Sequence, residues 1–176
     1  MSLINLDVYV GDSLVKWEPY KYNDCVVNRF AFDEWLKIAS DIYSEEELDS
    51  LLTNHPNVIQ GFVLYETRTL QPIAFSYLLR EDKRGQVVSI HGGGWGQSMC
   101  LSLLYYRGLI LMIHYLLGQG KRVRTSCLLN NTRAYRFLES VGFVKYRTSE
   151  EYVYMWINRD RLHRSRISNY LKMDFI

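Results

Sequence analysis

The chain has 176 residues, of which 48% are hydrophobic and 23% are charged. This mixture is typical of a globular protein and excludes a largely disordered one. The formal net charge of +2 is too small to indicate a nucleic-acid-binding protein. We therefore expect one domain over residues 1–176, with a basic C-terminal extension at 158–176.

The cysteines and the apolar stretches indicate the compartment in which we expect the protein to function. Three cysteines stand far apart without paired spacing: Cys25, Cys100 and Cys127. This favours reduced thiols and a cytoplasmic protein. The start of the chain lacks the basic segment and apolar core of a secretory signal. Residues 101–117 are apolar, but they include Arg107 and His114 and fall short of the ~20 residues of a membrane span, so we expect a buried helix and no membrane partner.

The first third of the chain is predicted to hold a hairpin and two helices. Alternating residues around Gly11-Asp12 favour a hairpin over residues 3–18, or a single edge strand there. Apolar residues at helical spacing predict a helix within residues 24–43. A capping box then predicts a second helix over residues 44–54.

Two pairs of strands are predicted on either side of the central region. Residues 61–66 and 73–80 form the first pair, and the polar turn 81–85 follows them. Residues 144–147 and 152–157 form the second pair. The basic tail after them has apolar residues at roughly helical spacing, and we expect it to dock as a helix or an arm.

The central region, residues 86–143, has the pattern of a βαβ unit. A strand at 87–91 runs into a glycine-rich bend, a long apolar helix ends at Gly118 or Gly120, and a second strand follows at 123–129. The glycines of the bend are Gly92, Gly93, Gly94 and Gly96. This order predicts an α/β fold with a parallel strand pair. A bend that feeds a helix N-terminus presents backbone N–H groups to an anion, so we expect a ligand that carries phosphate.

A short amphipathic helix closes the central region. Asn131 is a suitable N-cap, and Gly142 suits the left-handed residue that ends a helix, with Phe143 in position for the closing hydrophobic contact. The apolar residues between them share one helix face: Ala134, Phe137, Leu138 and Val141.

This closing segment resembles a known family. Asn131-Thr132-Arg133-Ala134, followed by Phe-Leu-Glu-Ser-Val-Gly-Phe at 137–143, resembles the N-x-x-A…L-x-x-x-G-F segment of the GNAT superfamily of acyl-coenzyme-A-dependent N-acyltransferases. The order of predicted elements over residues 24–157 is similar as well. The resemblance implies a mixed, mostly antiparallel sheet with a central, splayed parallel strand pair, flanked by helices. It also implies an N-acetyltransferase that moves an acetyl group from acetyl-coenzyme A to a primary amine by direct transfer in a ternary complex.

The resemblance implies where acetyl-coenzyme A binds as co-substrate. Its pantetheine would insert between the strands at 87–91 and 123–129 like an extra strand. The residues expected to bind it are Ile90, Gly92, Gly93, Ser98, Leu101, Ser102, Leu103, Leu104 and Asn131. No metal is expected, because the histidines and cysteines show no ligand spacing.

The family's glycine loop, Q/R-x-x-G-x-G/A, has no direct counterpart here. Counted back from Asn131, it falls at residues 100–106, which contain no glycine. Two interpretations remain open. Either residues 92–98 form a redrawn loop, or backbone amides of residues 98–104 hold the pyrophosphate.

Two residues are candidates for proton transfer. His91 ends the strand that often supplies the family's general base, and imidazole titrates near neutrality, although a structural histidine in a tight turn is the alternative. The family often places a tyrosine as thiolate acid four residues before the helix-ending glycine, and Leu138 stands there. Tyr135, one turn earlier, is the substitute donor, or else a packing or coenzyme-contact residue.

The acceptor implied is a small-molecule or protein amine, and a second copy of the chain is a further candidate partner. The alternative function is a non-catalytic GNAT-like binding or assembly module, which the glycine-free loop and Leu138 support. Attachment to nucleic acid through the basic tail is a third interpretation. Asp160 within that tail and the small net charge count against it.

Overall fold

The computed structural model describes residues 10–19, 54–94 and 99–175. The helices predicted within residues 24–43 and 44–54 therefore lie outside the described residues, apart from Asn54, which is helical. Ser98 and Gly96 also lie outside them.

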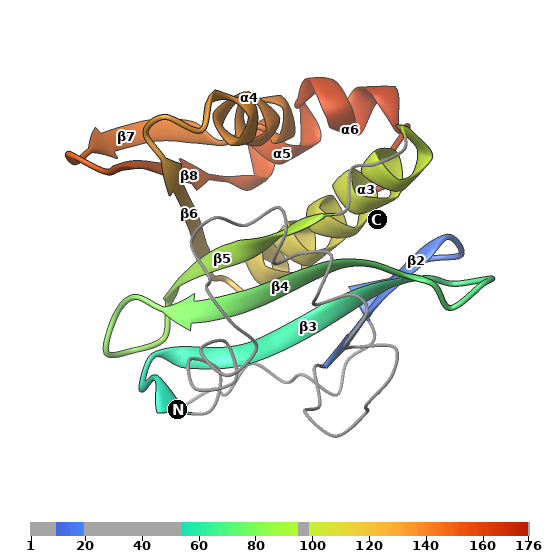
Figure 1. Ribbon diagram of the computed structural model, residues 1–176, viewed down its shortest axis with the longest axis horizontal. Coiled ribbons are helices and arrows are strands. Elements are labelled where there is room, and N and C mark those ends of the chain that lie inside the picture. Colours follow the sequence, from blue (N-terminus) through green and yellow to red (C-terminus); the bar gives the residue numbers. More distant parts are fainter. Residues whose placement is uncertain (1–9, 20–53, 95–98, 176) are drawn as a thin grey trace.

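Eight strands form one sheet in the order β1-β2-β3-β4-β5-β6-β8-β7 (Figure 1). Their bounds are β1 Val10–Gly11, β2 Val15–Pro19, β3 Val58–Glu66, β4 Pro72–Arg80, β5 Val87–Gly94, β6 Arg122–Leu128, β7 Val144–Thr148 and β8 Tyr152–Ile157. Every neighbouring pair is antiparallel except β5 and β6, which are parallel. The mixed, mostly antiparallel sheet with one central parallel pair confirms the predicted fold class.

The described helices are α3 Met99–Gly118, α4 Thr132–Val141, α5 Arg159–His163 and α6 Arg166–Tyr170. α3 packs on one face of the sheet, α5 and α6 pack against α3, and α4 packs against α6. The indole of Trp17 on β2 donates a hydrogen bond of 2.7 Å to the carbonyl of Gly108, which fixes α3 against the sheet. Phe137 of α4 stacks on Tyr105 of α3 with ring centroids 5.2 Å apart. Among the described residues, no helix is long and apolar enough to cross a membrane.

The core lies between α3 and the sheet. The middle of α3 buries Ile110, Ile113 and Leu116 completely. Every second strand residue faces these side chains, because side chains alternate across a sheet, and Leu64 and Val123 are two of them. The long helix that the sequence predicts to be buried has one buried face between Leu109 and Leu116, and it ends at Gly118, one of the two predicted ends.

The central region departs from the prediction at its glycines. Gly92, Gly93 and Gly94 were expected in a bend, but they continue β5 and pair with β4, down to the rung Ala74–Gly94. The strand is longer because β4 offers backbone partners along its whole length. The residues at 100–106, where the family's loop falls by counting, are helical.

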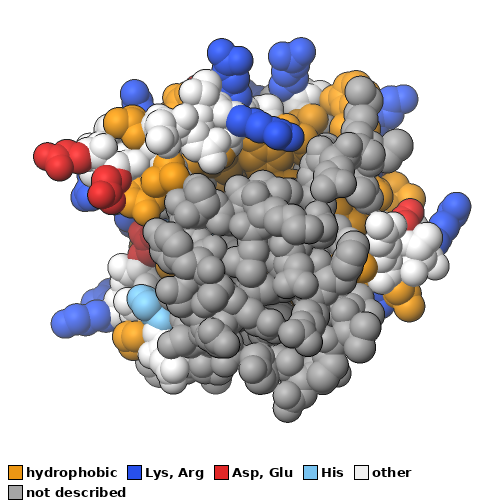
Figure 2. Space-filling view, in the orientation of Figure 1, with side chains coloured by type: hydrophobic (Ala, Val, Ile, Leu, Met, Phe, Trp, Pro, Cys, Tyr) orange, Lys and Arg blue, Asp and Glu red, His pale blue; other side chains and the backbone are white. Residues whose placement is uncertain are grey.

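The closing segment has the predicted caps. The side chain of Asn131 accepts a hydrogen bond of 3.0 Å from the amide of Ala134. Gly142 has φ +111° and ends α4, and a Cβ there would lie 2.6 Å from the carbonyl oxygen of Arg161. The basic tail that follows forms two short helices, α5 and α6, instead of one. Figure 2 shows Lys and Arg side chains along the edge that carries α4 and α6.

Candidate functional site

The parallel strands β5 and β6 separate after three rungs. Val87 pairs with Arg122, Val88 with Val123, and Ser89 with Arg124. Among the described residues no rung joins the strands beyond Ser89, although β5 continues to Gly94 and β6 to Leu128. Figure 1 shows β6 rising toward α4 while β5 stays beside β4, antiparallel to it. The pair is therefore splayed, as the sequence predicts.

A side chain replaces the backbone pairing where the strands part. The hydroxyl of Thr125 on β6 donates a hydrogen bond of 2.8 Å to the carbonyl of Ile90 on β5. Alternate residues of a strand face the same neighbour. Since the amide of Arg122 bonds to β5, the backbones of Ser126 and Leu128 turn toward the same side and line the opening. Ile90 itself is buried on the α3 face of the sheet.

Gly92 lies at the edge of the opening in a conformation that favours glycine. Its φ is +134°, and a Cβ there would lie 2.2 Å from the carbonyl oxygen of Phe75. A side chain at this position would therefore collide with β4. The neighbouring carbonyl, that of His91, accepts a hydrogen bond of 2.7 Å from the hydroxyl of Ser76. Gly93, the next residue, pairs with Phe75.

His91 is half-buried on the sheet face opposite α3. Its Nε2 lies 2.8 Å from the hydroxyl oxygen of Ser89, two residues earlier on the same face. Its ring stacks on Tyr77 of β4, with centroids 5.4 Å apart. The imidazole is thus fixed by contacts on β4 and β5.

Burial lowers the pKa of His91 to about 4, while the nearby charge of Glu81 opposes this shift. A buried imidazole loses hydration when it takes up a proton, so the neutral form is favoured. His91 is therefore uncharged at neutral pH.

Tyr135 lies on the other face, on α4. The hydrogen bond to Glu139 raises the pKa of the Tyr135 hydroxyl, and burial and the proximity of Cys127 add to the effect. Cys127 belongs to β6 beyond the last rung, on the α3 face. The two predicted catalytic residues therefore flank the opening from opposite faces. Leu138 is buried in the core and packs there.

Apart from Ser98, which lies outside the described residues, the remaining predicted coenzyme residues lie at the starts of α3 and α4. Leu101 and Ser102 belong to the start of α3, and Leu103 and Leu104 follow, with Leu104 packed against the core. The free backbone N–H groups of an α-helix lie in its first turn, which starts here at Met99. Asn131 is the exposed N-cap of α4 and follows the end of β6 at Leu128 after two intervening residues.

Three hydroxyl residues of the site were missed at the sequence level: Ser76, Ser89 and Thr125. All three are buried and hydrogen-bonded to the segment around Ile90 and His91. A small hydroxyl residue inside an apolar strand is the signal that could have revealed them, because a buried hydroxyl needs a partner.

No protein-family model and no curated protein sequence matches the chain. Solved structures do resemble it. A GNAT-family acetyltransferase from Bacillus anthracis superposes with a TM-score of 0.66 and 11% identity, over 87% of this chain and 99% of that one. The ribosomal-protein-S5-alanine acetyltransferase from Vibrio fischeri superposes with a TM-score of 0.65 and 14% identity, over 88% of this chain and 98% of that one.

A chimera of the spermidine N-acetyltransferase SpeG from Vibrio cholerae and hSSAT gives a TM-score of 0.63 and 11% identity, over 86% of this chain and 99% of that one. At such identities the likeness is one of fold. It agrees with the order of elements, the splayed parallel pair and the capped helix after Asn131. The chain therefore has the fold of the GNAT superfamily of acetyltransferases.

Proposed function

We propose that this protein is a cytoplasmic N-acetyltransferase that moves an acetyl group from acetyl-coenzyme A to a primary amine. The observation that carries the proposal is the opening between β5 and β6, where two parallel strands end their pairing at Ser89 and Arg124. An extended chain with amide groups can bind in such a gap through backbone hydrogen bonds. The pantetheine arm of coenzyme A is a chain of that kind.

The groups around the opening fit the coenzyme. The backbones of Ser126 and Leu128 would bind the pantetheine amides on the β6 side. The pyrophosphate would bind at the first turn of α3, where N–H groups and the helix dipole favour an anion. Of the two interpretations of the glycine-free loop, we adopt the one in which backbone amides of residues 98–104 hold the phosphates. Asn131 lies at the start of the neighbouring helix.

The residues on the two faces of the opening suit direct transfer. Attack by the amine forms the C–N bond and breaks the C–S bond of the thioester. His91 would take the proton that the amine loses, and Tyr135 would give a proton to the departing thiolate. The amide of Gly92 follows Ile90 on the β6 side of β5 and would polarise the thioester carbonyl.

The two candidate residues are suited to these roles in different degrees. The hydroxyl of Tyr135 carries its proton at neutral pH, and the raised pKa makes it a weaker acid toward the thiolate. His91 is neutral at that pH and able to accept a proton, but a pKa of about 4 makes it a weak base.

The first test is a calorimetric titration of the purified protein with acetyl-coenzyme A, with melting temperature as a second readout. We expect saturable binding that weakens with dephospho and pantetheine-truncated analogues. Release of free coenzyme A thiol in the presence of a panel of amines then tests turnover. Absence of binding at millimolar acetyl-coenzyme A would refute the proposal.

Paired variants separate chemistry from binding. His91→Gln and Tyr135→Phe keep the size of each side chain and remove the proton-transferring group. We expect each to lower turnover by about 10²-fold or more while acetyl-coenzyme A affinity stays within a few fold. Tyr154→Phe, which removes a hydroxyl on β8, is the control and should leave both nearly unchanged. Unaltered turnover in His91→Gln would remove His91 from the mechanism.

A non-catalytic GNAT-like module is the second candidate function. Leu138 favours it, because this position carries the proton-donating tyrosine in the family and is filled here by a buried, packing side chain. Saturable coenzyme binding without thiol release for any amine would support this function. The fold leaves the acceptor open, since similar structures are named for spermidine, a ribosomal protein and a nucleotide-linked sugar.

A further inference from the structure

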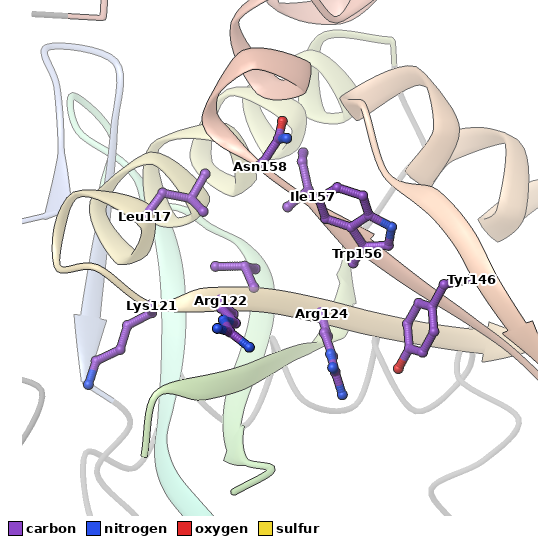
Figure 3. A pocket seen from close by; sticks show the side chains of 9 residues that line it. Leu117, Lys121, Arg122, Arg124, Tyr146, Trp156, Ile157 and Asn158 are labelled. Carbon is purple, nitrogen blue, oxygen red and sulfur yellow. The ribbon is translucent and has the colours of Figure 1, made fainter. Parts of the chain in front are cut away.

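A second pocket lies at the C-terminal end of α3, between the start of β6 and the end of β8 (Figure 3). Its volume is about 440 Å³, which lies in the range of small-molecule sites. α3 has 20 residues and is therefore about 30 Å long. The pocket and the first turn of α3, where the coenzyme's pyrophosphate would bind, are thus at opposite ends of the helix.

Cationic side chains dominate the wall of this pocket. Lys121, Arg122 and Arg124 line it, and one carboxylate, that of Glu81, pairs with Arg124 at 3.6 Å. Three positive charges against one negative charge leave a local excess of two. Arg122 is exposed, and no hydrogen bond or ion pair joins its side chain to the residues that the structure describes. An anionic ligand would therefore find a fork of guanidinium donors.

The cations already have the geometry of a binding wall. The ammonium of Lys121 donates a hydrogen bond of 2.8 Å to the carbonyl of Gly85, which holds it beside the start of β6 and leaves it two further N–H donors. The guanidinium of Arg124 lies over the ring of Tyr146, 5.1 Å from its centroid. These contacts reduce the entropy lost when a ligand orders the side chains.

Two aromatic rings complete the pocket. Tyr146, on the edge strand β7, is 44% exposed. Trp156 is half-buried, with the guanidinium of Arg161 5.5 Å from its ring centroid. Flat, partly exposed rings beside cations favour a ligand that joins a planar ring to an anion, because the ring stacks while the anion pairs.

One cation of the pocket shares a sheet face with the proposed reaction site. Arg124 is the rung partner of Ser89, so their side chains share a face. The hydroxyl of Ser89 lies 2.8 Å from Nε2 of His91 on that same face. Two strand residues separate Arg124 from the level of His91 and four separate Arg122 from it, spans of roughly 7 and 13 Å. A ligand of moderate length would reach from one to the other.

We propose that this pocket binds a nucleoside diphosphate group that the amine acceptor carries. Lys121, Arg122 and Arg124 pair with the phosphates, and the base packs against Tyr146 and Trp156. The proposal rests on the proposed function in one respect, namely that the acceptor's amine extends toward His91. Binding of the nucleotide group itself needs no acetyl transfer.

Calorimetric titration of the full chain with UDP and ADP, and with uridine, adenosine and inorganic pyrophosphate, tests the pocket. We expect at least one diphosphate to bind saturably, and its nucleoside and pyrophosphate to bind at least tenfold more weakly. Pyrophosphate that binds as tightly as the nucleotide would overturn the role of the rings. Absence of binding by both nucleotides at millimolar concentration would overturn the proposal.

Variants locate the binding. Arg122→Gln and Lys121→Gln should each weaken nucleotide binding at least tenfold. Arg147→Gln is the matched control. Like Arg124, Arg147 places its guanidinium over a tyrosine ring, 4.5 Å from the centroid of Tyr154, but it does not line the pocket. Equal weakening by all three substitutions would show non-specific attraction and overturn the proposal.

Competition separates this pocket from the coenzyme site. The nucleotide should bind with unchanged affinity when acetyl-coenzyme A is saturating, and full displacement would assign the binding to the coenzyme site and overturn the proposal. Acetyl-coenzyme A binding is measured on the same samples. If it fails while the nucleotide still binds in an Arg122-dependent way, the proposed function is wrong and the nucleotide pocket stands.

Discussion

The two ends of the β5–β6 pair differ in what forms hydrogen bonds with their backbone N–H and C=O groups. At the base, three consecutive rungs from Val87–Arg122 to Ser89–Arg124 join the strands. At the open end the hydroxyl of Thr125 bonds to the carbonyl of Ile90 in place of a strand amide. Backbone groups that are already paired cannot bind a ligand, so we expect a ligand that adds like a strand to bind at the open end.

The strongest test of this comparison is Gly92→Ala. The φ of +134° and the approach of 2.2 Å between a Cβ and the carbonyl oxygen of Phe75 should together cost about 3 kcal/mol or more in the free energy of unfolding. Urea denaturation measures this cost.

Gly120→Ala is the matched control for Gly92→Ala. Gly120 has φ +74°, and no atom lies within 4 Å of a Cβ there, so only backbone strain of about 1 kcal/mol should appear. Equal costs for the two variants would show that the open end tolerates a side chain at Gly92.

Acidification should weaken the open end through His91. Its pKa in the folded protein is about 4, below the 6.5 of an unfolded histidine. The unfolded chain therefore takes up the proton first, and stability falls as the pH decreases from about 6.5 toward 4. We expect His91 to account for a loss of about 2 kcal/mol between pH 7 and pH 5.

The control for this pH effect is His91→Gln, which does not titrate. Denaturation of both proteins at pH 7 and pH 5 isolates the contribution of His91 from that of other groups. An identical pH dependence in the two proteins would contradict the lowered pKa.

Removal of the hydroxyl that bridges the opening should have a smaller effect. Thr125→Val keeps the shape of the side chain but leaves the carbonyl of Ile90 without its 2.8 Å donor. We expect a loss of about 1–2 kcal/mol in unfolding free energy. Thr125→Ser retains the hydroxyl and should retain most of the stability. A fully stable Thr125→Val protein would mean that water or a backbone amide replaces the hydroxyl.

The smallest expected effect concerns the helix that begins beyond the open end of β6. Asn131→Ala removes the side-chain acceptor of the Ala134 amide and should cost about 1 kcal/mol. Asn131→Asp keeps an N-cap acceptor and should be close to neutral. Thermal denaturation distinguishes the two, and a neutral Asn131→Ala would show that this cap contributes nothing to α4.

Features that depend on neighbouring residues were predictable from the sequence. The caps at Asn131 and Gly142 and the end of α3 at Gly118 have the expected positions. The glycines at 92–94 were assigned to a bend because glycine usually marks turns, and the pairing that keeps them in β5 comes from β4. Local composition carries no information about such a partner strand.

The candidate site was predictable in part. The resemblance led to His91 and Tyr135, which lie on β5 and α4. The hydroxyls of Ser89 and Thr125 escaped because serine and threonine are common in strands and their partners are not visible in the sequence. Thr125 bonds to a residue 35 positions away.

The sequence by itself determined the order of the elements and the pairing of the two central strands in parallel, because hydrophobic period, caps and chain connectivity are local properties. Only the tertiary structure decided where that pairing stops, how deeply His91 is buried, and which cations meet beside Tyr146 and Trp156. These properties arise when segments far apart in the chain share one surface, as Trp17 and Gly108 do across 91 positions. Burial and charge at such a meeting point then determine the chemistry that each side chain can perform.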